Sequence, residues 1–342
     1  MWGYVLTRLL WMVPTLLGVM TLTFVIIQFV PGGPVEQYLA EARAVPGAET
    51  TAMGYRGASG VDPQRLEQIR ALYGFDKPVG ERYLLLLGQC VRFDLGQSFF
   101  RNESVARLLW QKLPVSISLG MWTFFLTYLI AVPLGIAKAV RAGSRFDVGS
   151  TLLLTVGYAI PGFVLGVVLL VVFAGGLQWF PLRGLVSEGW ESLSWGARIA
   201  DYLWHIALPI TAMVVGNFAT TAMLTKNAFL DEIRRQYVVT ARAKGLGERQ
   251  VLWRHVLPNA LIPLLTGLPA AFVGAFFTGS LLIETLFSLD GLGLLGYESV
   301  IRRDYPVVLG TLYFYTLLGL LAKLCSDLSY CWVDPRVRFD GN

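Results

Sequence analysis

Six long apolar blocks constrain the fold of this chain more than any other feature. A helix needs about 20 residues to cross roughly 30 Å of hydrocarbon, and each block is close to that length. Continuous apolar runs satisfy their own backbone hydrogen bonds as helices, so no closed barrel is needed. We therefore predict an all-α polytopic membrane protein with six transmembrane helices. The blocks run approximately over residues 9–30, 116–137, 148–174, 206–224, 261–283 and 307–323.

Composition agrees with a membrane protein rather than with two soluble domains. Hydrophobic residues make up 55% of the 342 positions and charged residues 15%, and the mean hydropathy is +0.57. The first block is about 22 residues long and lacks a small-x-small cleavage site before Pro31, so we interpret it as a retained span rather than a signal peptide. Three cysteines form no motif, and no disulfide framework or zinc site is expected.

The distribution of lysine and arginine predicts the orientation. If Met1 lies in the cytoplasm, the short inner segments carry fourteen basic residues and the short outer loops only four. The positive-inside rule then places both termini in the cytoplasm. The segment from Pro31 to about Pro114 is too long to contribute to this rule. Because the basic residues are spread over the inner loops, the net charge of +5 does not indicate nucleic-acid binding.

We expect four regions along the chain. Residues 1–30 form the first span, and residues 31–114 form a helical insertion on the outer side. Within it, Asp62-Pro63 precedes apolar residues at helical spacing, from Leu66 to Tyr73. Residues 115–325 form a core of five spans that includes an inner loop at 225–260, and residues 326–342 form a cytoplasmic tail.

The sequence offers no catalytic constellation. A phosphate-binding Gly-x-x-x-x-Gly-Lys-Ser/Thr motif is missing, so we expect no ATP hydrolysis by this chain. Neither histidine lies in a His-Glu-x-x-His motif, and the middle of every predicted span is free of charge. Glu284 is the nearest candidate, and we expect a helix-end carboxylate that reaches water. Prolines that could kink spans are Pro14, Pro133, Pro161, Pro209, Pro263 and Pro269.

The inner loop from Asp231 to Arg254 is too polar to enter lipid but keeps apolar residues for contact. Ala241 and Ala243 are small enough to let another surface approach the backbone. Gly245 is placed to end a helix in a left-handed conformation, and Pro258 is placed to end a second helix before the fifth span. From the residues alone two interpretations stay open: a rigid element that passes a push to the adjoining spans, or a solvated loop with snorkelling arginines.

A resemblance to a known family favours the first interpretation. The segment Gln236–Leu246, followed by His255-x-Leu257-Pro258, resembles the coupling loop of the dipeptide and oligopeptide permeases, which are membrane subunits of ATP-binding-cassette (ABC) importers. Two positions depart from the family pattern, because Val239 stands in place of glutamate and His255 in place of isoleucine. Further matches to the family lie at residues 31–34, 73–78, 94–98, 112–114, 278–288 and 303–306.

A narrower resemblance is to the first permease subunit of the Yej-type importers, which take up oligopeptides and the peptide-nucleotide antibiotic microcin C. Asp290-Gly-Leu-Gly293 favours it, since many peptide permeases have proline in place of Asp290. The other segments that carry it lie at residues 143–148, 157–161, 180–187, 201–205 and 224–227.

The resemblance implies a type I ABC importer permease fold in the bacterial inner membrane. It implies as partners a homologous second permease subunit, two ABC ATPase domains on one tandem chain or two, a periplasmic peptide-binding protein, lipid and a peptide substrate. ATP and Mg would be bound by the ATPases and no cofactor by this chain. The implied ATPase-coupling residues are Tyr237, Thr240, Ala241, Arg242, Ala243, Lys244, Gly245, Leu246, His255, Leu257 and Pro258. A periplasmic gate would be formed by Glu284, Asp290, Gly291 and Gly293.

Two other classes of protein remain as alternatives. A secondary carrier driven by an ion gradient would place a site at the midplane of a dimer and would predict uptake that survives ATP depletion. A membrane enzyme or a scaffold would need a clustered catalytic set or the absence of a cavity.

Overall fold

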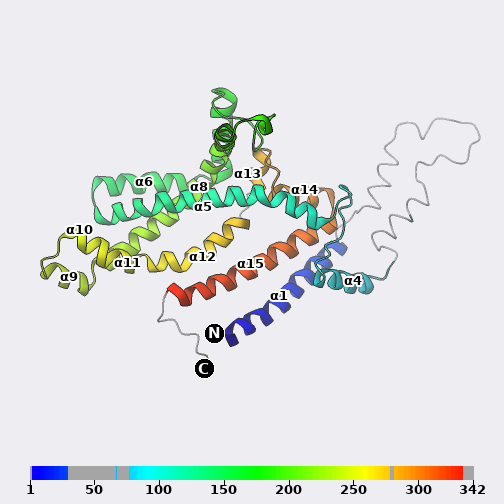
Figure 1. The fold of residues 1–342 in the computed structure, drawn as a ribbon, viewed down its shortest axis with the longest axis horizontal. Coiled ribbons are helices and arrows are strands. Elements are labelled where there is room, and N and C mark those ends of the chain that lie inside the picture. Colours follow the sequence, from blue (N-terminus) through cyan, green and yellow to red (C-terminus); the bar gives the residue numbers. More distant parts are fainter. Residues whose placement is uncertain (1, 30–66, 68–76, 278–280, 334–342) are drawn as a thin grey trace, which may run out of the picture. The chain divides into compact units, whose positions relative to one another are not determined.

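The computed structural model describes residues 2–29, 67, 77–277 and 281–333. Within these ranges the regular structure is helical, apart from one isolated bridge between Gln97 and Ser104. The helix predicted after Asp62-Pro63 and most of the predicted tail lie outside the described residues. The elements, coloured along the chain in Figure 1, are α1 (Trp2–Phe29), α4 (Val79–Val91), α5 (Val105–Val140), α6 (Arg145–Ala159), α7 (Gly162–Leu169), the π-helix η1 (Leu170–Gly176), the 3₁₀ turn η2 (Trp190–Ser192), α8 (Trp195–Ile233), α9 (Gln236–Ala243), α10 (Glu248–Val251), the π-helix η3 (Leu252–Val256), α11 (Leu257–Ala260), α12 (Ile262–Phe277), α13 (Leu281–Leu286), α14 (Leu292–Arg302) and α15 (Tyr305–Val333).

The helices of the described residues confirm the predicted polytopic, all-α fold. Four of them, α1, α5, α8 and α15, are long and apolar enough to cross a membrane unbroken. Two further candidates are bent pairs: α6 with α7 and η1, bent by 91°, and residues 248–260 with 262–275, bent by 49°. Counting each pair as one span gives up to six, the number that the sequence predicts. In the second pair only residues 262–275 belong to the predicted fifth span, because residues 248–260 belong to the predicted inner loop.

The larger break lies at Ile160-Pro161, in the third predicted span. A proline disfavours helical geometry in the residue before it, and Ile160 is extended, with φ −88° and ψ 118°. Pro161 is also outside the helical region, at ψ 134°, and a new helix starts at Gly162. Four of the other predicted prolines, Pro14, Pro133, Pro209 and Pro269, lie inside continuous helices.

The chain forms two compact units, each with its own core. The unit that contains the candidate site consists mainly of the described residues between 112 and 294. Its main cluster joins α5, α8 and α13 through Leu119, Ile206 and Ile283. The predicted small pair Gly162 and Gly166 serves this packing. A Cβ on Gly162 would lie 3.0 Å from the Ala212 carbonyl oxygen, and one on Gly166 would lie 3.1 Å from Ile283.

The second unit joins two segments that carry the family resemblance. Asp304, which is buried, accepts a hydrogen bond from the Ser98 hydroxyl at 2.5 Å and one from the Phe99 backbone N–H at 3.0 Å. Ser98 in turn accepts the backbone N–H of Arg101 at 3.1 Å. Residues 94–98 and 303–306, some 200 positions apart in sequence, are therefore held together by one carboxylate.

Candidate functional site

The segment between α8 and α12 folds as a helix, a glycine turn and a second helix, and an apolar cluster holds it in place. Val238 and Ala241, three positions apart on α9, turn inward and pack with Ala139 of α5 and Phe229 of α8. In Figure 1, α9 and α10 lie beside the ends of α5 and α8. We call this set the loop-base cluster; it consists of Ala139, Phe229, Val238, Ala241, Val251, Val256 and Ala260.

Gly245 ends α9 in the left-handed conformation that the sequence predicts, with φ +78°. Its N–H donates to the Arg242 carbonyl at 2.9 Å, and the Leu246 N–H donates to the Ala241 carbonyl at 3.4 Å. This pair of bonds satisfies the free carbonyls at a helix end, and glycine adopts the required φ without a side-chain clash. A Cβ on Gly245 would meet nothing within 4 Å. The turn is therefore constrained by its backbone and open on its outer surface.

Polar contacts fasten α9 to its neighbours. The Tyr237 hydroxyl donates to Glu232 at the end of α8, at 2.6 Å, and accepts from the Asn259 amide of α11 at 3.2 Å. Partial burial, together with the bond to Glu232, raises the pKa of Tyr237, so the phenol keeps its proton. The Arg242 guanidinium donates two hydrogen bonds to Glu248 of α10, at 2.8 and 3.1 Å. These contacts connect α9 to α8 before it and to α10 and α11 after it.

The apolar residues of the segment divide into two groups. Val238 and Val251 are fully buried, whereas Val239 and Trp253 expose 55% and 60% of their surface. Ala241 packs in the loop-base cluster, so the surface that approaches its backbone belongs to this chain. Ala243 is exposed, as expected. The outer surface also includes Thr240, Arg242, Lys244 and Gly245, and Leu246 is partly buried.

Pro258 does not end the second helix. It is the second residue of α11, and the helix ends two residues later at Ala260. The turn directly before it, from Leu252 to Val256, is π-helical. A widened turn of this kind tolerates a residue that has no N–H to donate. His255 and Leu257 are partly buried and Pro258 is exposed.

The four residues of the predicted gate lie together, but Glu284 differs from expectation. Instead of reaching water it is fully buried, with 0% of its surface exposed. Its carboxylate accepts the Ser116 hydroxyl at 3.0 Å and the Leu294 N–H at 2.9 Å. A Cβ on Gly291 would lie 2.6 Å from that carboxylate, and one on Gly293 would lie 3.0 Å from it.

Asp290, the fourth residue, is exposed and forms an ion pair with Lys112 of α5. No signal in the local sequence could have revealed the burial of Glu284, since its partner Ser116 is 168 positions away.

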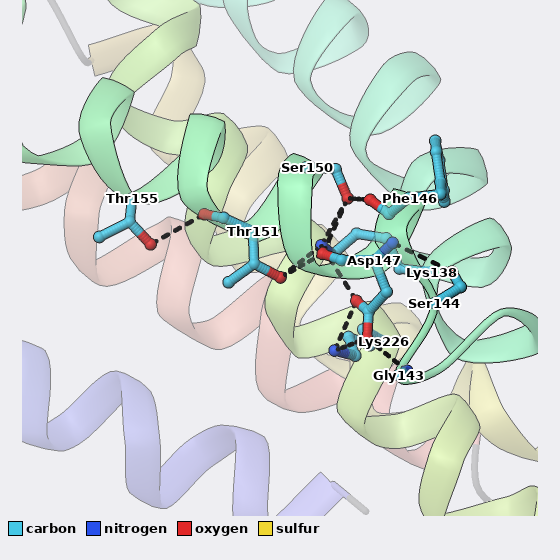
Figure 2. A network of polar contacts seen from close by, with 9 residues as sticks. All are labelled: Lys138, Gly143, Ser144, Phe146, Asp147, Ser150, Thr151, Thr155 and Lys226. Atoms are coloured by element: carbon cyan, nitrogen blue, oxygen red, sulfur yellow. Dashed lines mark hydrogen bonds and ion pairs between the residues drawn. The ribbon is translucent and has the colours of Figure 1, made fainter.

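Sequence reasoning missed one charged network near the loop-base cluster (Figure 2). Asp147, near the start of α6, accepts hydrogen bonds from Lys226 of α8 at 2.7 and 2.8 Å. It also forms an ion pair with Lys138 of α5, at 3.2 Å. Lys138 is fully buried and donates to Ser150 and Thr151 at 2.8 and 2.7 Å. The sequence shows only that Lys138 and Asp147 flank one short turn, and nothing in it brings Lys226 to them.

These features define an integral membrane protein in which a polar segment of two helices and a glycine turn connects α8 to α12. In the described ranges no group of three His, Cys, Asp or Glu residues is placed to hold a metal ion. The family of binding-protein-dependent transport system inner membrane components matches residues 131–339. The chain therefore belongs to this family, and it is a permease of the ABC importer class.

The relatives extend the match to the whole chain. The inner membrane ABC transporter permease protein YejB of Escherichia coli O157:H7 is 52% identical, with 100% of both chains covered. The peptidoglycan transport system permease protein YejB of Agrobacterium fabrum is 50% identical over 99% of each chain. The similarity to the Yej-type subunit that the motifs predicted is confirmed.

A solved structure supports the fold. The inward-facing MetNI methionine ABC transporter aligns with a TM-score of 0.50 and 18% identity, over 67% of this chain and 97% of that chain. At this identity the likeness concerns the fold alone, and it agrees with the predicted type I importer permease fold.

Proposed function

We propose that this chain forms half of the translocation pathway of an ATP-driven importer of oligopeptides, and that ATPase subunits bind its segment 237–258. The observation that carries the proposal is the turn at Gly245, whose backbone is constrained and whose outer surface is open. It ends α9, the helix that Tyr237 fastens to α8 and α11. A peptide cargo is supported by the motifs shared with peptide permeases and by the A. fabrum relative, whose name assigns it peptidoglycan transport. Microcin C-type peptide-nucleotides belong to the same proposal.

The contacts of α9 explain how such a segment would transmit force. Two kinds of contact join it to α8: the bond from Tyr237 to Glu232, and the packing of Val238 on Phe229. A displacement of α9 by a bound ATPase would then move the end of α8 rather than bend a loop. Closure of the ATPases on ATP would turn the translocation pathway from inward-facing to outward-facing, and hydrolysis would reset it.

The proposal requires the other members of the machine. A second, homologous permease subunit completes the pathway, and a peptide-binding protein on the periplasmic side must favour one state of the pathway, since only differential affinity shifts an equilibrium. Two ATPase domains, on one chain or two, bind ATP and Mg, and this chain binds neither. Both termini and the segment 237–258 would lie in the cytoplasm, as the excess of basic residues in the short inner segments predicts.

The residues around Glu284 would form a periplasmic gate. The buried carboxylate holds the loop before α14 to α5 through Ser116, and Asp290 adds an ion pair to Lys112. A movement between α5 and α13 would break both contacts together, which is the property that a gate needs.

The central test is the substitution Gly245→Asp. We expect the variant to insert in the membrane but to lose uptake and substrate-stimulated ATP hydrolysis, because the new side chain occupies the surface that the ATPase needs. Gly189→Asp is the matched control: Gly189 also has φ +78° and lies before α8, at the opposite end from α9. It suffers the same backbone strain and should retain transport. Normal transport in Gly245→Asp would exclude the proposed contact.

A further inference from the structure

The charged network of Figure 2 and the loop-base cluster both include residues of α5 and α8. Lys138 directly precedes Ala139, a member of that cluster, and Lys226 lies three residues before Phe229, another member. The cluster itself contains residues of α5, α8, α9, α10, η3 and α11 but none of α6. α6 already packs along α8, and Asp147 adds an ionic contact at the end of α8 that leads into α9.

The two lysines differ in what they connect. Lys138 and Asp147 flank the short turn between α5 and α6, so their ion pair closes a hairpin. Lys226 comes from α8, the helix that leads into α9, and both of its bonds go to the carboxylate of Asp147. Loss of Lys226 would leave Asp147 still paired with Lys138 inside the hairpin. Loss of Asp147 would instead remove the carboxylate with which both lysines pair.

The backbone around Asp147 fixes its position. Ser144 caps α6 by accepting the Asp147 N–H at 3.2 Å, and the carboxylate accepts the Gly143 N–H at 3.1 Å. Lys138 also donates to the Asp147 carbonyl, at 2.9 Å. The Gly143 N–H and Lys138 hold the carboxylate, and Ser144 and Lys138 hold the backbone of the same residue. The side chain therefore does not turn to follow Lys226, and a shift of α8 pulls on α6 itself.

We propose that the Lys226–Asp147 ion pair is a mechanical link that makes α6, and the bent span that continues beyond Pro161, move with α8 and the α9 segment. Asp147, Lys138 and Lys226 are positioning residues, since they act through the helices that they join. The inference rests on the proposed function, because α9 must be moved by an ATPase for the link to transmit anything.

The test uses Lys226→Met in the whole complex, purified with its ATPase subunits and reconstituted in vesicles. Methionine keeps an unbranched side chain of similar length and removes the charge. We expect assembly and basal ATP hydrolysis to be retained, while peptide uptake per ATP hydrolysed falls about tenfold, within the range typical of coupling between sites. Lys226→Arg preserves the ion pair and should restore uptake per ATP to near the unsubstituted value. Lys323→Met makes the same change at an exposed position of α15 and should have no effect.

Two results would overturn the link. The first is normal uptake per ATP in Lys226→Met. The second is loss of assembly in Lys226→Met with rescue by Lys226→Arg, which would assign the ion pair to folding alone. Failure of the unsubstituted chain to purify with any ATPase would instead refute the proposed function, and the link with it.

Discussion

At the scale of single residues, two glycines set how closely α5 approaches its neighbours. A Cβ on Gly120 would overlap the carbonyl of Ala275 in α12, and a Cβ on Gly135 would lie 2.6 Å from the carbonyl oxygen of Ala222 in α8. In both places the obstacle is backbone, which cannot rotate away. Close backbone approach through small residues is a main source of helix association in membranes.

The substitution Gly120→Ala should therefore destabilise the protein. We expect a cost of about 1–3 kcal/mol, as for other overpacked sites, measured as a lower unfolding midpoint of the detergent-solubilised protein. Gly216→Ala is the control, since Gly216 lies inside α8 with nothing within 4 Å of its Cβ position. It should be neutral or slightly stabilising, because alanine is the better helix former. Equal midpoints in the two variants would show that α12 does not approach Gly120 so closely.

Single residues also show what the sequence reveals and what it conceals. The left-handed turn at Gly245 was predictable because its cause is local: a polar helix followed by a glycine. The burial of Glu284 and the pairing of Lys226 with Asp147 were not, since their partners lie 168 and 79 positions away. From the sequence alone a charged residue is expected to be exposed, because charged side chains are rarely buried without a partner.

At the scale of elements, α14 begins without a capping residue of its own. Gly291, directly before α14, has no side chain that could accept a hydrogen bond. The N–H groups in the first turn of α14 instead donate to side chains of other helices. The Leu292 N–H donates to Ser116 of α5 at 2.8 Å, and the Leu294 N–H donates to Glu284 of α13 at 2.9 Å. Glu284 thus serves as a cap supplied by a neighbouring helix.

Glu284→Gln should weaken this cap. The amide offers one acceptor oxygen where the carboxylate offers two. With that oxygen toward the Leu294 N–H, the NH₂ group donates to Ser116, whose own O–H then loses its acceptor. Leaving a buried partner unsatisfied costs about 1–3 kcal/mol, and we expect thermal unfolding of the purified protein to shift downward accordingly. The exposed Glu188→Gln should not shift it. A stability loss combined with unchanged uptake per folded complex would remove the gate from the proposed function and leave Glu284 a packing residue.

The existence of the spans was predictable, because length and hydropathy suffice. Which of the spans bend was not predictable. Six prolines were candidates for kinks, yet only two of them lie at a bend: Pro161 at the 91° bend, and Pro263, the second residue of α12, beside the 49° bend. Pro133 and Pro209 remain inside continuous helices. Whether a proline stays inside a continuous helix or breaks it depends on the side chains that pack around it. Those side chains come from residues distant in sequence.

At the scale of the whole molecule, the orientation of α8 decides whether the proposed coupling is feasible. A helix of 39 residues is about 58 Å long, well beyond the roughly 30 Å of hydrocarbon that it must cross. Its two ends therefore emerge on opposite sides of the membrane. Glu188 lies before the start of α8 and Lys244 beyond its end, so a label at each position shows which side of the membrane that end faces.

Cysteine labelling measures that orientation directly. In a chain whose native Cys90, Cys325 and Cys331 are replaced by serine, Glu188→Cys should react with a membrane-impermeant maleimide in right-side-out vesicles. Lys244→Cys should react only in inverted vesicles, because the excess of basic residues keeps its side in the cytoplasm. Nucleotide is available to an ATPase only on that side. The reverse pattern would place the Gly245 turn in the periplasm, where an ATPase could neither bind it nor move α8.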